Sequence, residues 1–100
     1  RVGEFLIGRG SLFVLDGRPK DAEPLLRRAV EIFESGAGGA PWRLAEAKGW
    51  LGRALLQQGN TDGASFLEES RTGLEEVLGE NHWRTDRMRV RTDEREPVAR

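Results

Sequence analysis

The residues of this sequence that could do chemistry are one histidine and a few clusters of charged side chains. His82 is the only histidine, and the chain contains neither cysteine nor tyrosine. An acid–base or metal-ligating histidine needs a second functional group within reach. The composition supplies no cysteine, tyrosine or second histidine for this purpose, so we expect no enzymatic activity, no catalytic residue, no metal site and no cofactor.

Two pairs of carboxylates raise the question of a metal ion. Glu68-Glu69 and Glu75-Glu76 lie in a stretch that we expect to be helical. Glu68 and Glu75 are seven positions apart, which places them on one helical face about two turns from each other. That separation is too large for one ion without further ligands. We therefore interpret these glutamates as part of a solvated outer face.

A basic stretch near the C-terminus suggests a different function. Its arginines are Arg84, Arg87, Arg89 and Arg91. Such a stretch can bind a phosphate backbone. However, Asp86, Asp93 and Glu94 lie among the arginines, and the whole chain has a formal net charge of −1. A nucleic-acid-associated regulator segment is therefore the alternative hypothesis rather than the leading one.

The segment from Pro41 to Gly59 is the clearest helix in the sequence. Its apolar residues recur at the spacing of one helical face: Ala47, Trp50, Leu51, Ala54 and Leu55. Proline suits the first helical position, and glycine suits the residue after the last turn. Gly49 and Gly52 lie inside this helix, although each costs ~1 kcal/mol relative to alanine. We expect a neighbouring helix to come close at these glycines.

Four further helices are predicted around this one, at about residues 1–16, 19–34, 61–78 and 82–94. Pro24 leaves the start of the second helix open between Pro19 and Ala22, and we favour Pro19. The N-cap of the fourth helix is Asn60 or Thr61. The glycine-rich segment 35–40 lacks the Lys-Ser/Thr of a phosphate-binding loop and is interpreted as a connector. We expect one domain over residues 1–95 and a frayed tail over 96–100.

Each predicted helix has an expected set of buried residues. In the first helix these are Phe5, Leu6, Leu12 and Phe13. In the second helix they are Ala22, Leu25, Leu26, Ala29, Val30 and Phe33. In the fourth helix they are Phe66, Leu67, Ser70, Leu74, Val77 and Leu78. The fifth helix has only Trp83, Met88 and Val90, and we expect Trp42 and Trp83 to be buried or half-buried.

The sequence also matches itself after about forty residues. Gly10 and Gly17 recur 42 positions later as Gly52 and Gly59, and Trp42 recurs 41 positions later as Trp83. The repeating units are residues 1–38 and 41–79, followed by a fifth, capping helix at 82–94. Each unit is a helix pair of the length found in helical repeat arrays.

Parts of these units resemble a known family. Residues 51–59, Leu-Gly-Arg-Ala-Leu-Leu-Gln-Gln-Gly, and residues 22–32, Ala-Glu-Pro-Leu-Leu-Arg-Arg-Ala-Val-Glu-Ile, look like tetratricopeptide repeats. The variety is the long one of kinesin light chains, as found attached to bacterial serine/threonine kinases and regulators. Residues 78–82, Leu-Gly-Glu-Asn-His, resemble the loop between successive repeats, which implies a structural role for His82. The sequence departs from the pattern at Arg9-Gly10, where the family has Leu-Gly.

The resemblance implies an all-α fold, a tetratricopeptide-like α-solenoid of two helix pairs plus a fifth helix. The first helix of each pair would line a concave groove that binds a protein or peptide. The implied groove residues are Glu46, Gly49, Arg53, Leu56 and Gln57 on the third helix, and Ile7, Ser11 and Val14 with Glu4 on the first. Arg53 is the best candidate to pair with a partner carboxylate, because its guanidinium can bond bidentately. We expect a regulatory or scaffolding segment of a larger bacterial protein.

Two expectations concern the surroundings of the chain. No apolar run approaches the ~18 residues of a membrane span, and no signal-peptide pattern opens the sequence, so we expect a cytoplasmic protein without a membrane partner. The first helix is apolar nearly all round, whereas the fifth is rich in arginine. We therefore expect the fifth helix to cap the array and the N-terminal helix to mediate self-association, most simply as a two-fold dimer.

Overall fold

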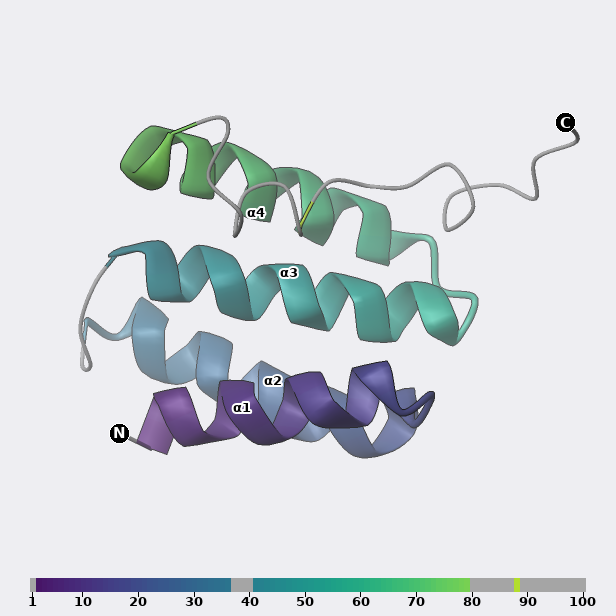
Figure 1. The fold of residues 1–100 in the computed structure, drawn as a ribbon. Helices are drawn as coiled ribbons and strands as arrows, with labels where there is room; N and C mark the ends of the chain where they lie inside the picture. Colours follow the sequence, from purple (N-terminus) through teal and green to yellow (C-terminus); the bar gives the residue numbers. More distant parts are fainter. Residues whose placement is uncertain (1, 37–40, 80–87, 89–100) are drawn as a thin grey trace, which may run out of the picture.

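The computed structural model describes residues 2–36, 41–79 and Met88. These residues form four α-helices and no strand: α1 (Val2–Leu15), α2 (Pro19–Glu34), α3 (Pro41–Gln57) and α4 (Asp62–Leu78) (Figure 1). The prediction of an all-α chain is confirmed, and the helix bounds agree with the predicted ones to within about two residues. The predicted fifth helix, with His82, Trp83 and the arginine-rich stretch, lies outside the described residues.

The helix α3 lies at the centre of the arrangement. Figure 1 shows it between α4 on one side and the pair α1 and α2 on the other. It packs on both α2 and α4, and at one edge on α1. Its five predicted inward residues, Ala47, Trp50, Leu51, Ala54 and Leu55, are all buried, which confirms the interpretation of this helix. None of the helices in the described ranges is long and apolar enough to cross a membrane.

The turns after α1 and α3 have the same structure. Gly17 and Gly59 adopt positive φ angles of 73° and 81°, a conformation that glycine reaches without strain. In each turn the glycine N–H donates to the carbonyl three residues earlier, at 3.1 Å and 2.9 Å. The next N–H, from Arg18 or Asn60, donates to the carbonyl five residues earlier, at 2.8 Å and 2.9 Å. These bonds satisfy carbonyls that the helix end would otherwise leave open.

The residues at the N-termini of α2 and α4 explain where these helices begin. The helix α2 begins at Pro19, as favoured, and continues through Pro24. Proline at the first position loses no helical bond, and Pro24 removes only one early donor. At α4 the N-cap position belongs to Thr61, whose side chain makes no capping bond. The preceding residue, Asn60, provides the capping hydrogen bond instead: its Oδ1 accepts from the Asp62 N–H at 2.9 Å.

The buried faces of α2 and α4 largely match the expectation. The buried residues are Ala22, Leu26, Ala29 and Val30 on α2, and Leu67, Ser70 and Leu74 on α4. Leu25, Phe33 and Phe66 are half-buried at the edges of these faces. Val77 is 46% exposed, so its predicted burial is wrong. It lies in the last turn of α4.

The predicted inward face of α1 is wrong for two of its four residues, Phe5 and Leu12, while Leu6 and Phe13 pack against the core. Phe5 and Leu12 are 61% and 65% exposed, and Leu6 and Phe13 are only half-buried. The buried residues are instead Gly3, Ile7, Gly10 and Val14. A Cβ atom added at Gly10 would lie 2.6 Å from the Leu26 side chain, and one at Gly3 would lie 2.6 Å from the Phe33 ring. The glycines therefore face α2, and the larger side chains turn outward.

A pair of glycines brings α3 and α4 into backbone contact. A Cβ atom on Gly52 would lie 2.7 Å from the carbonyl oxygen of Gly63, and a Cβ on Gly63 would overlap the carbonyl of Gly52. Neither position therefore tolerates a side chain without separating the helices. This contact explains why α3 contains Gly52 despite its helical cost, as the sequence predicted.

Candidate functional site

The residues predicted to line a groove are unequally accessible. On α3, Glu46 and Gly49 are buried, Arg53 and Leu56 are half-buried, and Gln57 is exposed; on α1, Ile7 and Val14 are buried and Ser11 is half-buried. Ile7 and Val14 are 5% and 2% exposed and belong to the hydrophobic core. Their interpretation as accessible contacts for a partner therefore needs correction: they support the packing of α1.

Gly49 contacts a residue from far along the chain. Met88 is completely buried, and a Cβ atom added at Gly49 would overlap its sulfur. The same Cβ would lie 2.5 Å from the Ser70 hydroxyl of α4. We call Gly49 and Ser70, with Met88 lying against them, the Gly49–Ser70 surface. Because glycine has no side chain, this surface has room for one unbranched apolar side chain.

The Ser70 hydroxyl is the unusual polar group of this surface. Its oxygen is buried and has no hydrogen-bond partner within the described part of the chain. A buried hydroxyl without a partner costs ~1–3 kcal/mol. The helix α4 therefore holds a polar atom, adjacent to Met88, that an incoming carbonyl or N–H group could satisfy.

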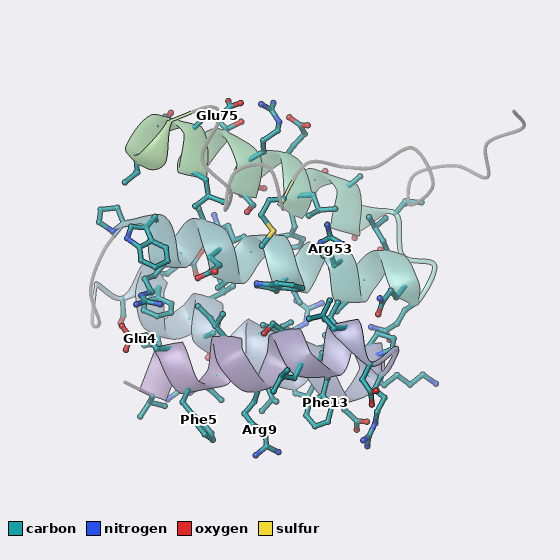
Figure 2. The ribbon with its side chains drawn as sticks, viewed as in Figure 1. Glu4, Phe5, Arg9, Phe13, Arg53 and Glu75 are labelled. Carbon is teal, nitrogen blue, oxygen red and sulfur yellow. The ribbon has the colours of Figure 1, made fainter. Side chains whose placement is uncertain are left out.

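Arg53 extends the surface by one turn of α3. It follows Gly49 by four positions and therefore lies on the same helical face. Its guanidinium carbon lies 5.8 Å from the centre of the Trp50 ring, and the side chain is half-buried. Figure 2 shows Arg53 on α3, on the side facing the viewer. The ring beside the guanidinium restricts its position, so a fixed positive charge stands close to an apolar contact.

Three other predicted groove residues, Leu56, Gln57 and Ser11, make contacts within the four-helix structure. A Cβ atom on Gly63 would lie 2.8 Å from Leu56, so Leu56 faces α4. The Gln57 side-chain amide donates to the Val14 carbonyl at 3.1 Å, which ties α3 to the end of α1. The Ser11 hydroxyl donates within its own helix to the Gly8 carbonyl at 3.0 Å. Leu56 and Gln57 follow Arg53 by three and four positions and therefore lie on the same side of α3, whereas no contact with Arg53 is seen for Ser11 among the described residues.

Glu4, also expected on the groove side, connects the two helices that would form the groove. Its carboxylate lies 3.2 Å from Arg43 of α3. Arg43 in turn lies over the half-buried Trp42 ring, 4.2 Å from its centre. The partial burial of Trp42 agrees with the prediction, and the ion pair fixes the start of α1 beside α3.

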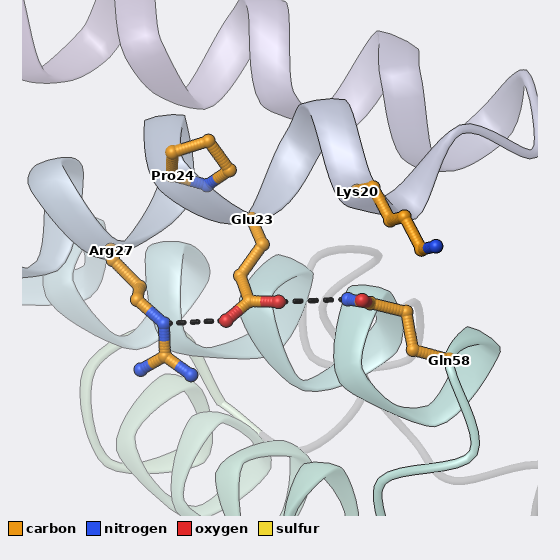
Figure 3. A pocket seen from close by; sticks show the side chains of 5 residues that line it. All are labelled: Lys20, Glu23, Pro24, Arg27 and Gln58. Carbon is orange, nitrogen blue, oxygen red and sulfur yellow. Dashed lines mark hydrogen bonds and ion pairs between the residues drawn. The ribbon is translucent and has the colours of Figure 1, made fainter.

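A shallow hollow of about 260 Å³ lies between α2 and the end of α3. Figure 3 shows its lining residues, Lys20, Glu23, Pro24, Arg27 and Gln58. The Glu23 carboxylate accepts from Gln58 at 2.8 Å and from Arg27 at 2.7 Å. These two donors, first Gln58 and then Arg27, lower the pKa of Glu23. Because the Glu23 carboxylate already accepts these hydrogen bonds, we do not interpret the hollow as a binding site. The contact of Glu23 with Gln58 instead links α2 to α3.

Two of the four carboxylates of α4 that raised the metal question have a common partner. Arg71 lies between them and contacts Glu68 and Glu75, each at 2.7 Å. These contacts, first with Glu68, raise the pKa of Arg71. Within the described ranges, no group of three or more metal-binding side chains occurs. Arg71 was not among the predicted residues, although its spacing of three and four from the glutamates is the usual one for helical ion pairs.

Ser70 and Met88 were predicted only as buried residues of separate helices. Their proximity joins positions distant in sequence, and periodicity within one helix carries no signal for such a contact. The internal glycine at position 49 was the available signal, since it predicted a close neighbour without identifying it.

Comparison with protein-family models, curated proteins and solved structures gives no match for this chain.

Proposed function

We propose that this chain is a helical-repeat module that binds a protein or peptide segment on the face formed by α3 and α4. This α3–α4 face consists of the Gly49–Ser70 surface and Arg53. The observation that carries the proposal is the complete burial of Met88 against Gly49 and Ser70. A side chain from outside the four helices thus fits this face. The role expected of such a module is regulatory or scaffolding, within a larger cytoplasmic protein of bacterial origin.

The proposed tetratricopeptide-like arrangement is supported by equivalent contacts in the two helix pairs. The turns at Gly17 and Gly59 share their hydrogen-bonding pattern, 42 positions apart. Gly10 faces Leu26 of α2, and Gly52 faces the backbone of Leu67 of α4, whose nitrogen would lie 3.0 Å from a Cβ atom added at Gly52. Leu67 follows Leu26 by 41 positions. The first helix of each pair therefore contacts the second through a matching glycine, as expected of stacked repeats.

The chemistry of the α3–α4 face defines the partner. An unbranched apolar side chain, such as methionine, would take the place of Met88 at Gly49. A carboxylate nearby would pair with Arg53, and a backbone polar group would reach the Ser70 hydroxyl. Nucleic-acid binding remains the alternative, but its arginines lie outside the described residues and no described contact favours it.

Selection from a displayed library of random peptides against the immobilised chain tests this proposal. We expect the selected peptides to combine an unbranched apolar residue with an acidic one. Arg53→Glu should weaken their binding at least tenfold, because it replaces attraction by repulsion at a half-buried position. Arg28→Glu, the same change at an exposed arginine of α2, is the matched control and should leave binding within about twofold.

Both variants should retain the helical circular dichroism of the parent chain. Peptides that bind the Arg53→Glu variant as tightly as the parent would contradict the proposed surface. Failure to select any peptide at micromolar affinity would contradict the proposed function itself.

A further inference from the structure

The outer face of α1 is apolar and uncovered. Val2, Phe5, Leu12 and Leu15 are 64%, 61%, 65% and 69% exposed. Together with the exposed Gly8 we call these residues the α1 stripe; they lie opposite the buried face of the helix. Figure 2 shows Phe5, and Arg9 beside the stripe, pointing away from the other helices. Soluble chains seldom expose several large apolar side chains along one helix without a partner.

Gly8 is the residue of this stripe that the monomer does not explain. Glycine in a helix interior is unfavourable relative to alanine. Gly3 and Gly10 have a packing reason, because a side chain there would collide with Phe33 or Leu26. At Gly8 an added Cβ atom would meet nothing within 4 Å. The open space at Gly8 is therefore a notch in an otherwise bulky apolar surface.

We infer that a second copy of this chain packs on the α1 stripe as an antiparallel, two-fold partner. Phe5, Gly8, Leu12 and Leu15 are spaced by three, four and three positions, the spacing of a two-helix seam. In an antiparallel pair Leu12 of one copy lies opposite Gly8 of the other, and Phe5 lies opposite Leu15. Each pairing occurs twice, so the surface is complementary to itself, as a two-fold interface requires.

The charges near the stripe are compatible with this pairing. None of the four seam positions carries a charged side chain. Arg9 lies beside the seam, with its guanidinium carbon 5.9 Å and 5.7 Å from the centres of the Phe5 and Phe13 rings. This position keeps the charge out of the centre of the contact and in reach of water. Because apolar side chains form the contact, added salt should not weaken it.

The area of the stripe limits the strength of the dimer. A helix of this length extends about 20 Å. One such face buries roughly half of the ~800 Å² per partner that is usual for a stable interface. The dimer should therefore be weak, with a dissociation constant in the micromolar range, and should appear only as the protein concentration rises.

Sedimentation velocity of the full chain over a concentration series tests the inference. The parent chain should pass from monomer to dimer. Gly8→Leu should raise the dissociation constant at least tenfold because it fills the notch that receives Leu12. Leucine is also the better helix former, so unfolding would not explain a loss of the dimer. Leu12→Glu should have the same effect, while Val77→Glu, a matched change on α4, should have none.

The orientation is tested by cross-linking, since the chain has no cysteine of its own. An equimolar mixture of Phe5→Cys and Leu15→Cys chains should form the mixed disulfide dimer on mild oxidation. Phe5→Cys alone should not, because the two copies of residue 5 would be about 15 Å apart along the helix. A chain that stays monomeric at every concentration, a dimer unaffected by Gly8→Leu, or preferential linkage through residue 5 alone would overturn the inference.

Discussion

At the scale of single residues, two buried or half-buried side chains give the α3–α4 face its chemistry. The Ser70 hydroxyl is buried beside Met88 without a hydrogen-bond partner among the described residues. Arg53 holds a permanent charge against the Trp50 ring. The unpartnered Ser70 hydroxyl costs stability, and a ligand that brings a polar group would relieve that cost; a carboxylate on the ligand would add an ion pair with Arg53.

Glu23 provides a pH test of a single contact. Its pKa lies below the ordinary value of 4.5, because Gln58 and Arg27 donate hydrogen bonds to the charged carboxylate. A carboxyl group with a depressed folded-state pKa stabilises the fold above its unfolded-state pKa and loses that contribution as pH falls through the folded-state value. The parent chain should therefore lose stability from about pH 4.5 downward. Glu23→Gln should be less stable near neutral pH and lose less on acidification.

Urea denaturation at pH 7 and at pH 3.5 measures this difference. Glu31→Gln is the control, because Glu31 also pairs with an arginine but is 65% exposed. An identical loss of stability on acidification in Glu23→Gln and the parent chain would show that Glu23 does not link α2 to α3.

At the scale of the helices, glycines decide which faces meet. The contacts of Gly52 with Gly63 and of Gly10 with Leu26 allow separations that no side chain at these positions would permit. The sequence predicted this role for Gly52, and the apolar spacing of α3 identified its buried face. The prediction of the buried face of α1 was wrong for Phe5 and Leu12, because the largest apolar residues were assumed to point inward. Phe5 and Leu12 point outward, because burying Gly3 and Gly10 lets α2 come closer than bulky side chains would.

The glycine contacts predict opposite effects of one chemical change. Gly63→Ala should destabilise the chain by ~1–3 kcal/mol, because its methyl group would enter the backbone of Gly52 and force α3 and α4 apart. Gly8→Ala should stabilise it by ~0.5–1 kcal/mol, because position 8 has open space and alanine favours the helix. Urea denaturation at submicromolar concentration, below the proposed dimerisation, measures both. Equal effects of the two substitutions would contradict the packing described for α4.

The Gly49–Ser70 surface could be predicted only in part. The helical face with Gly49 and Arg53 followed from spacing, and the internal glycine indicated a close neighbour. The identity of that neighbour depends on how a distant segment meets α3, which local pattern does not encode. Ile7 and Val14 were assigned to the groove because equivalent positions in repeats face it. In this chain the small buried face of α1 draws both residues into the core.

At the scale of the whole molecule, the chain offers two surfaces with different tasks. The α3–α4 face carries Met88, Ser70 and Arg53, whereas the α1 stripe lies on the far side of the helix from the core and is wholly apolar at its seam. A ligand on the first and a second copy on the second would not compete for the same residues. A dimer would thus present two ligand-binding faces, and a divalent partner would bind more tightly than a single peptide.

The binding of a peptide on the α3–α4 face is tested most directly by NMR. A selected peptide with one methionine and one acidic residue is titrated into the isotope-labelled chain. We predict that the amide signals of Gly49, Arg53 and Ser70 shift together with the methyl signal of Met88, while those of Glu23 and Arg27 on α2 stay in place. Shifts confined to α2 or to the α1 stripe, with Gly49 and Met88 unchanged, would contradict the account.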